Sequence, residues 1–217
     1  MDAYEKILLP NNVVLKRYID EDAMNPRTEY DNMGVFFHWH RRDHYGDKSM
    51  KEAGFESPED FLAFMKRDGG VFLPVYLYDH SIQRVSTESF MGRAQHAEWD
   101  SGQVGFIYAT AEKIRECMQV KRISKKTREQ VVKNLQSEVE TYNMYISNEV
   151  YGYVVELLDD DEVRACDGDE DEILELEGEH LLDRRKIPDD GADAARFLTT
   201  VKDRLETTKS GGSTTAS

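Results

Sequence analysis

The sequence predicts an α+β protein, in which helices pack against a mainly antiparallel sheet and an acidic C-terminal appendage follows. Residues 34–40 are all β-branched, aromatic or imidazole after Gly34, and residues 71–78 form a continuous apolar run, so both have the pattern of strands. Ser57 and Pro58 mark a helix start between them, and residues 124–146 carry apolar side chains at helical spacing. The strands and helices follow no regular β-α-β rhythm, and this favours an antiparallel arrangement.

The remaining strands are predicted from shorter apolar runs. Residues 13–19 and 104–108 are of this kind, and residues 150–158 form another. The run 71–78 contains Pro74, which cannot donate a hydrogen bond to a neighbouring strand. An acidic turn at residues 159–162 is expected to lead into a partner strand at 163–166.

The helices are predicted from their capping residues. Ser57 begins one that ends at Gly69 and Gly70, Thr110 begins a short one, and Ser124 begins a long one. A last helix is expected after a block of acidic residues.

The acidity is concentrated in one part of the chain. The 217 residues have a formal net charge of −15, but residues 156–193 alone contribute −13 and the remainder is close to neutral. We therefore expect four regions along the chain: an α+β core domain at 1–166, an acidic linker at 167–189, a C-terminal helix at 190–206 and a disordered tail at 207–217.

Three interpretations of the acidic segment are open: a solvated loop, an interaction surface that imitates nucleic-acid phosphates, and a cation site. The residues from Asp167 begin like a calcium-binding loop. The pattern then fails, because Glu172 stands where the turn glycine is needed and Gly178 where the bidentate glutamate is needed.

The composition excludes several classes of protein. The excess of acid argues against binding to a nucleic-acid backbone, and no apolar run has the ~20 residues that a membrane helix needs. The two cysteines, Cys117 and Cys166, do not form a disulfide framework, and the N-terminus does not resemble a signal peptide. We expect a cytoplasmic protein that does not bind a membrane. The sequence leaves the cofactor unknown.

One candidate site lies at the end of the strand 34–40. His38 and His40 share one face of this strand, and His44 follows, so these three are the candidates for a metal site. The spacing departs from known histidine metal motifs by one residue, and no metal is assigned. The neighbouring Arg41 and Arg42 suit an anion better than a cation.

Two further clusters of polar residues lie at the ends of predicted apolar strands. Asp79 and His80 come directly after the strand 71–78, while Asp100, Ser101 and Gln103 lead into the strand 104–108. With His40 they are candidate catalytic residues, in which a histidine would act as a base and Ser101 as a nucleophile. Tight turns explain the same residues equally well.

Four blocks of the sequence together resemble a family of uncharacterised proteins of bacteriophages and mobile elements. The blocks are His40-Arg-Arg…Gly46-Asp47, Leu77–Ser81, Trp99–Gly105, and Glu138–Tyr142 with Val150–Val154. The resemblance extends from about residue 31 to 166, and His38 and His44 depart from its pattern. It implies a phage origin and a role inside the host cell, and it transfers no activity and no catalytic residues.

Three functions are therefore open, of which the last is a structural or assembly role. The first is a phage accessory protein that acts through contacts with a protein partner, in host takeover or counter-defence. The second is a small hydrolase or nucleotide-handling enzyme with a His/Asp/Ser site at the strand ends. Convergence of His40, Asp79 or His80, and Asp100 in one place would favour the enzyme.

Overall fold

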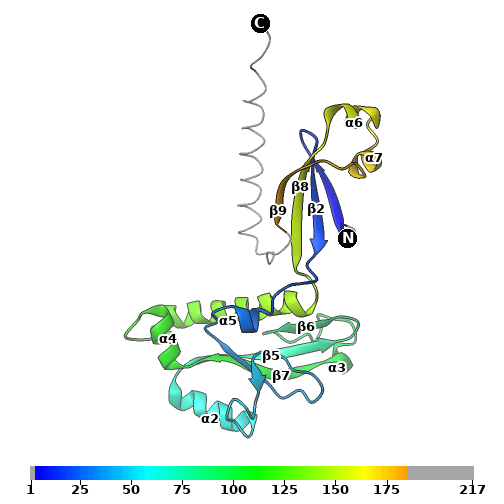
Figure 1. The fold of residues 1–217 in the computed structure, drawn as a ribbon. Helices are drawn as coiled ribbons and strands as arrows, with labels where there is room; N and C mark the ends of the chain where they lie inside the picture. Colours follow the sequence, from blue (N-terminus) through cyan, green and yellow to red (C-terminus); the bar gives the residue numbers. More distant parts are fainter. Residues whose placement is uncertain (1–2, 185–217) are drawn as a thin grey trace. The chain divides into compact units, whose positions relative to one another are not determined.

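The computed structural model describes residues 3–184 and confirms the α+β class. The chain forms two compact units (Figure 1). The larger consists of residues 24–147. The smaller is assembled from both ends of the described chain, 3–23 and 148–184.

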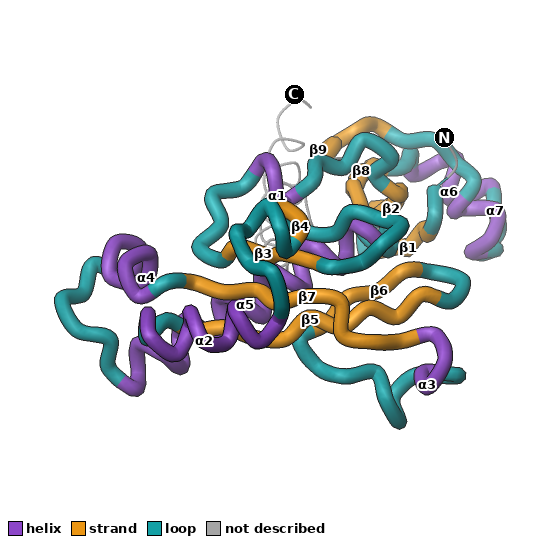
Figure 2. The backbone as a smooth tube through the Cα atoms, turned by 90° about the horizontal axis from the view of Figure 1, so that it is seen from below, coloured by secondary structure: helices purple, strands orange, loops and turns teal. Residues whose placement is uncertain are grey.

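The larger unit contains a five-stranded sheet with the order β4-β3-β7-β5-β6. All neighbouring pairs are antiparallel except β3 and β4, which are parallel. In Figure 2, β5 and β7 run side by side through this unit. The strands are β3 (Val35–His38), β4 (Lys48–Ser49), β5 (Val71–Asp79), β6 (Gln83–Ser86) and β7 (Ser101–Ala109).

Three helices of this unit begin where the sequence predicts, and the short helices α1 and α3 were not predicted. The hydroxyls of Ser57, Thr110 and Ser124 each accept a hydrogen bond from a backbone N–H in the first turn. Gly69 ends its helix in the left-handed conformation, with φ of 76°. The helices are α1 (Pro26–Glu29), α2 (Pro58–Asp68), α3 (Ala97–Asp100), α4 (Ala111–Met118) and α5 (Lys125–Ile146).

The sheet is buried on both faces because β3 and β7 are apolar on both. Phe36 packs in the cluster that includes Leu135 and Val139 of α5. Phe37 points the other way, into an aromatic cluster with Phe61 of α2. Figure 1 shows α5 along one side of the sheet and α2 along the other. The alternation of side chains predicted for this strand is therefore confirmed.

Pro74 is accommodated because one edge of β5 is only partly covered. Among the described residues, β6 pairs only with Tyr76–Asp79, so Pro74 lies outside the stretch that β6 covers. A proline is tolerated where no strand needs its missing N–H. The same strand has an irregular register between Val75 and Tyr76.

The smaller unit contains a four-stranded antiparallel sheet with the order β1-β2-β8-β9. Its middle strands were predicted, but the outer two were not. The strands are β1 (Glu5–Leu9), β2 (Val13–Ile19), β8 (Tyr151–Leu157) and β9 (Glu179–Arg184). Two short helices, α6 (Asp160–Ala165) and α7 (Glu170–Leu174), connect β8 to β9.

Three expectations need correction. Residues 163–166 do not form a strand, because Asp159 accepts hydrogen bonds from two backbone N–H groups and begins α6 instead. The segment 167–189 is not a plain linker, since it contains α7 and β9. The region 1–166 is not one domain, because β2 pairs with β8 apart from the larger sheet. The predicted helix at 190–206 and tail at 207–217 lie outside the described residues.

Candidate functional site

His80 and Asp100 form a dyad in the larger unit. His80 follows β5 and Asp100 precedes the neighbouring β7, and Nδ1 of His80 lies 2.8 Å from Oδ2 of Asp100. The Tyr78 ring stacks on His80, and His96 lies close by, with ring centroids 6.1 Å apart in both pairs. Trp99 of α3 is 83% exposed. The carboxylate orients the imidazole and leaves Nε2 for proton exchange.

The other members of the predicted catalytic set are bonded elsewhere. Ser101 donates its hydroxyl hydrogen to the carbonyl of Ala97, at 2.5 Å, which is a turn contact. Gln103 donates to the carbonyl of Gly105, and Asp79 accepts from the amide of Gln83. The structure thus joins His80 with Asp100 and does not supply Ser101 as a nucleophile to this pair.

His40 belongs to a different group of residues. Its Nδ1 accepts a hydrogen bond from the backbone N–H of Asp43, and its ring packs on Tyr45. His38 and His44 are also neighbours, with ring centroids 5.3 Å apart. Even so, within residues 3–184 no group of three or more His, Cys, Asp or Glu side chains is arranged to hold a metal ion.

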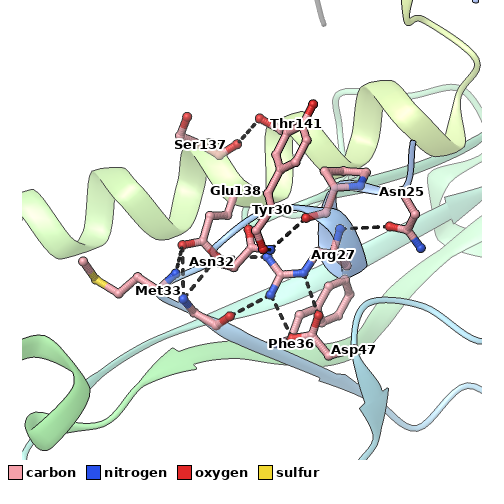
Figure 3. Close-up of polar contacts among 12 residues, drawn as sticks. Asn25, Arg27, Tyr30, Asn32, Met33, Phe36, Asp47, Ser137, Glu138 and Thr141 are labelled. Carbon is pink, nitrogen blue, oxygen red and sulfur yellow. Dashed lines mark hydrogen bonds and ion pairs between the residues drawn. The ribbon is translucent and has the colours of Figure 1, made fainter. Parts of the chain in front are cut away.

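Arg41 and Arg42, the predicted anion-binding pair, are both exposed in the loop between β3 and β4. The arginine that organises this part of the chain is Arg27 of α1, whose side chain is 1% exposed. Its Nε and Nη2 donate to the two carboxylate oxygens of Asp47, at 2.9 and 2.8 Å. Its Nη1 donates to Glu138 of α5, at 2.9 Å (Figure 3).

The two carboxylates also bind the backbone of the strand that they flank. Asp47 accepts the N–H of Phe36, and Glu138 accepts the N–H groups of Met33 and Gly34. Burial alone would lower the pKa of Arg27, but the hydrogen bonds and charges of Asp47 and Glu138 outweigh it and raise the pKa. These hydrogen bonds link α1, β3 and α5 to one another.

Two clefts flank α5. One, of about 510 Å³, lies beside the Arg27 network and is lined by residues such as Tyr30, Asn32 and Ser137. The other, of about 320 Å³, lies between α5 and the segment that follows β6, and its lining includes Arg84 and Arg93. Both volumes fall within the range for small-molecule sites, and the smaller one lies near its lower end. Neither cleft is lined by His80 or Asp100.

The acidic residues of the smaller unit form a folded surface, which we call the acidic cap and define as residues 159–177. Asp159 and Asp169 cap α6 and α7. Ile173 is buried against Val14 and Leu158, so apolar contacts fix the cap to the sheet. The exposed acidic side chains are Asp159, Asp160, Asp161, Glu162, Asp167, Asp169, Glu170, Asp171, Glu172, Glu175 and Glu177. The sequence predicted this acidity but not its ordered scaffold.

Strands β2 and β8 of the smaller sheet are joined by a buried ion pair. Lys16 of β2 donates to Oε2 of Glu156 on β8, at 2.8 Å, and the two side chains are 10% and 5% exposed. The same oxygen accepts the N–H of Gly178, and His180 of β9 lies 3.1 Å from Oε1. Burial alone would raise the pKa of Glu156, but Lys16 and the Gly178 N–H lower it. Glu156 therefore stays charged and ties β9 to β8.

The described residues define an α+β protein with a His–Asp dyad in one unit and an acidic cap in the other. None of its described helices is both long and apolar enough to span a membrane. Comparisons of the chain with protein-family models, with curated proteins and with solved structures gave no match.

Proposed function

We propose that this chain is a cytoplasmic accessory protein of a bacteriophage, which binds a host protein through the acidic cap. The phage origin rests on the sequence resemblance given above. The partner is expected to present a basic surface, of the kind that host nucleic-acid-binding proteins carry. The role would then be host takeover or counter-defence.

The observation that carries this proposal is the anchoring of the cap. A free acidic tail would lose conformational entropy when a partner ordered it, and this would weaken binding. Here Ile173 and the capping residues Asp159 and Asp169 already hold the backbone in place. The cap carries eleven exposed carboxylates and a single basic residue, Arg164. A preformed surface of this charge attracts a basic partner and presents the carboxylates at fixed spacings.

The test is affinity purification of the full chain from infected bacterial cells, with a cap variant for comparison. This variant is Asp167→Asn, Glu170→Gln, Asp171→Asn and Glu172→Gln, and it keeps both capping aspartates. The matched control removes four exposed charges from the larger unit, with Glu112→Gln, Glu116→Gln, Glu129→Gln and Glu140→Gln. The two variants have the same net charge.

We expect one dominant host protein with the wild type and the control, and its loss with the cap variant. The affinity of the purified pair should fall steeply as salt rises, because counterions screen exposed charges. The proposal would be contradicted if the cap variant recovered the host protein equally well, or if the affinity did not change with salt concentration.

A second candidate is a small hydrolase, and the specific observation in its favour is the contact between His80 and Asp100. His80 would act as a general base on a water molecule, since Ser101 is bonded to Ala97. Assays with a chromogenic ester and a chromogenic phosphodiester test it. His80→Gln should lower a measured rate by about 10²–10⁴-fold, and Ser101→Ala should leave it unchanged. A rate that is equal in wild type and His80→Gln would exclude the dyad.

A further inference from the structure

His38 is a buried polar side chain without a polar partner. It is 2% exposed, and neither of its ring nitrogens has a hydrogen-bond partner among residues 3–184. Buried polar atoms in folded proteins are nearly always paired, so an unpaired imidazole asks for an explanation. Histidine is also the side chain whose charge changes nearest to neutral pH.

Side chains of the loop that follows β3 contact His38. We call residues 39–47 the histidine loop, because it contains His40 and His44 and follows directly after His38 in β3. The rings of His44 and Tyr45 meet the His38 ring edge-on, at centroid distances of 5.3 and 6.2 Å. The His40 ring packs on Tyr45 in turn, at 5.4 Å. The loop therefore folds back over the strand from which it starts.

The two ends of the histidine loop are fixed. Trp39 donates its N–H to the carbonyl of Val104 on β7, and Asp47 donates its N–H to the carbonyl of Phe36. Beyond the loop, Met50 donates to the carbonyl of His38. Between these ends, the four residues 41–44 are all exposed. The middle of the loop is therefore held down by contacts with His38 and Tyr45, and it is the part that is able to lift.

The charged groups around His38 disfavour its protonation. Burial lowers the pKa of His38 most, and His44 and His40 lower it further, while Glu52 beyond β4 opposes them. Tyr45 faces Asp43 of the loop, Asp79 of β5 and Tyr142 of α5. Burial first, and then these groups, raises the pKa of Tyr45, so it remains neutral.

We propose that His38 is a proton-controlled latch for the histidine loop. Neutral His38 stays buried under His44 and Tyr45 and keeps the loop closed. Protonated His38 leaves the face of the sheet, and residues 41–44 move away from it. The backbone hydrogen bonds of Trp39 and Asp47 keep the two ends of the loop in place.

The direction of the pH effect follows from the charge. A histidine that is harder to protonate in the closed state favours closure at pH values above its ordinary pKa of 6.5. As the pH falls below that value, the open state takes up the proton more readily and gains population. Opening is therefore expected on the acid side of 6.5 and closure on the neutral side.

The test uses the full chain with Trp39→Phe, Trp99→Phe and Tyr45→Trp, so that the one tryptophan lies in the loop at the position whose ring contacts His38. Residue 45 is buried in the closed loop, so its emission reports whether the loop lifts. Emission is recorded from about pH 8 to about pH 5, a range that spans histidine titration. NMR of the histidine ring protons gives the titration of His38 itself, which is assigned by comparison with His38→Gln.

We expect a reversible red shift whose midpoint coincides with the His38 titration. His38→Gln should abolish the shift, and the matched control His80→Gln should retain it. A flat emission profile, or a shift that persists in His38→Gln, would overturn the latch. If His38→Gln does not fold, the wild-type NMR titration decides, with the His38 signal assigned by elimination from the single variants of the other five histidines. A midpoint that follows His40 or His44 instead also overturns it.

Discussion

The Nη1 atom of Arg27 donates to Oε2 of Glu138 at 2.9 Å, although the two residues lie 111 positions apart in the chain. The same guanidinium holds Asp47 through two hydrogen bonds. Three elements thus depend on one buried cation, since α1 carries the arginine, α5 carries the glutamate and Asp47 binds the backbone of β3.

Arg27→Met is expected to lower the free energy of unfolding by about 3–5 kcal/mol, because it leaves two carboxylates without their cation. Urea unfolding followed by circular dichroism measures this. Arg93→Met is the matched control, since Arg93 pairs with Glu88 in an exposed setting, at 54% and 69% exposure. That change should cost less than about 1 kcal/mol. Similar losses in both variants would show that the burial of Arg27 does not increase the contribution of its ion pairs to the free energy of unfolding.

Glu156→Gln is expected to destabilise the smaller sheet by about 3 kcal/mol near pH 7, because it leaves Lys16 buried without a counter-charge. The pKa of Glu156 is held below its ordinary value of 4.5. The stabilisation is therefore complete above that value and is lost as the pH falls through the lower folded-state pKa. Hydrogen exchange of the β8 amides should differ between the variant and the wild type at neutral pH, and the two should converge in acid.

The control for this prediction is Glu5→Gln in the same sheet, where the carboxylate pairs with Arg17 and is 43% exposed. It should change β8 exchange little at any pH. A difference between Glu156→Gln and the wild type that persists undiminished into acid would contradict the assignment of the effect to the Glu156 charge.

Gly46→Ala is expected to destabilise the larger unit more than Gly92→Ala does. Both glycines are left-handed, with φ of 68° and 72°, so each substitution costs about 1–2 kcal/mol in backbone strain. A Cβ at Gly46 would also clash with Cγ of the buried Phe36, whereas nothing lies within 4 Å of one at Gly92. Thermal unfolding of the two variants separates the clash from the strain, and equal melting temperatures would refute the clash.

Asn143→Leu is expected to lower stability by about 1–3 kcal/mol, because it leaves a backbone donor unpaired. The Oδ1 atom of Asn143 on α5 accepts the N–H of Val85 on the edge strand β6, at 2.8 Å. Asn134→Leu on the same helix is the control, since its amide bonds only to Gln130 at the surface in the contacts observed. Urea unfolding should place the control within about 0.5 kcal/mol of wild type. A loss in the control as large as in Asn143→Leu would remove the edge-strand explanation.

The sequence predicts those features whose causes are local. Ser57, Thr110 and Ser124 each cap a helix through a residue three positions away, so their signals lie within a short stretch of sequence. The prediction of a strand at residues 163–166 was wrong. The segment forms a helix instead, because Asp159 caps its first turn. β9 was missed because its mixed sequence gains strand structure only by pairing with β8.

The same distinction between local and distant causes explains which residues of the candidate site the sequence predicts. His80 and Asp100 were identifiable because His80 follows one apolar run and Asp100 leads into another, and pairing of β5 with β7 joins them. Arg27 was passed over because its partners, Asp47 and Glu138, are distant in sequence. The one local signal near it is Asn25, which caps α1. Exposed Arg41 and Arg42 are conspicuous in the sequence, whereas the buried arginine is not.

The pairing of β2 with β8 has a consequence for synthesis of the chain. Val13 lies opposite Leu157, so the smaller sheet cannot close until the ribosome has made the whole of residues 24–147. The five strands of the larger sheet, by contrast, all come from within that continuous stretch. The larger unit is thus able to fold first, and β1 and β2 join a complete sheet only after β8 has been synthesised. A fragment that spans residues 24–147 should therefore be obtainable by itself, and the same is not true of the N-terminal strands.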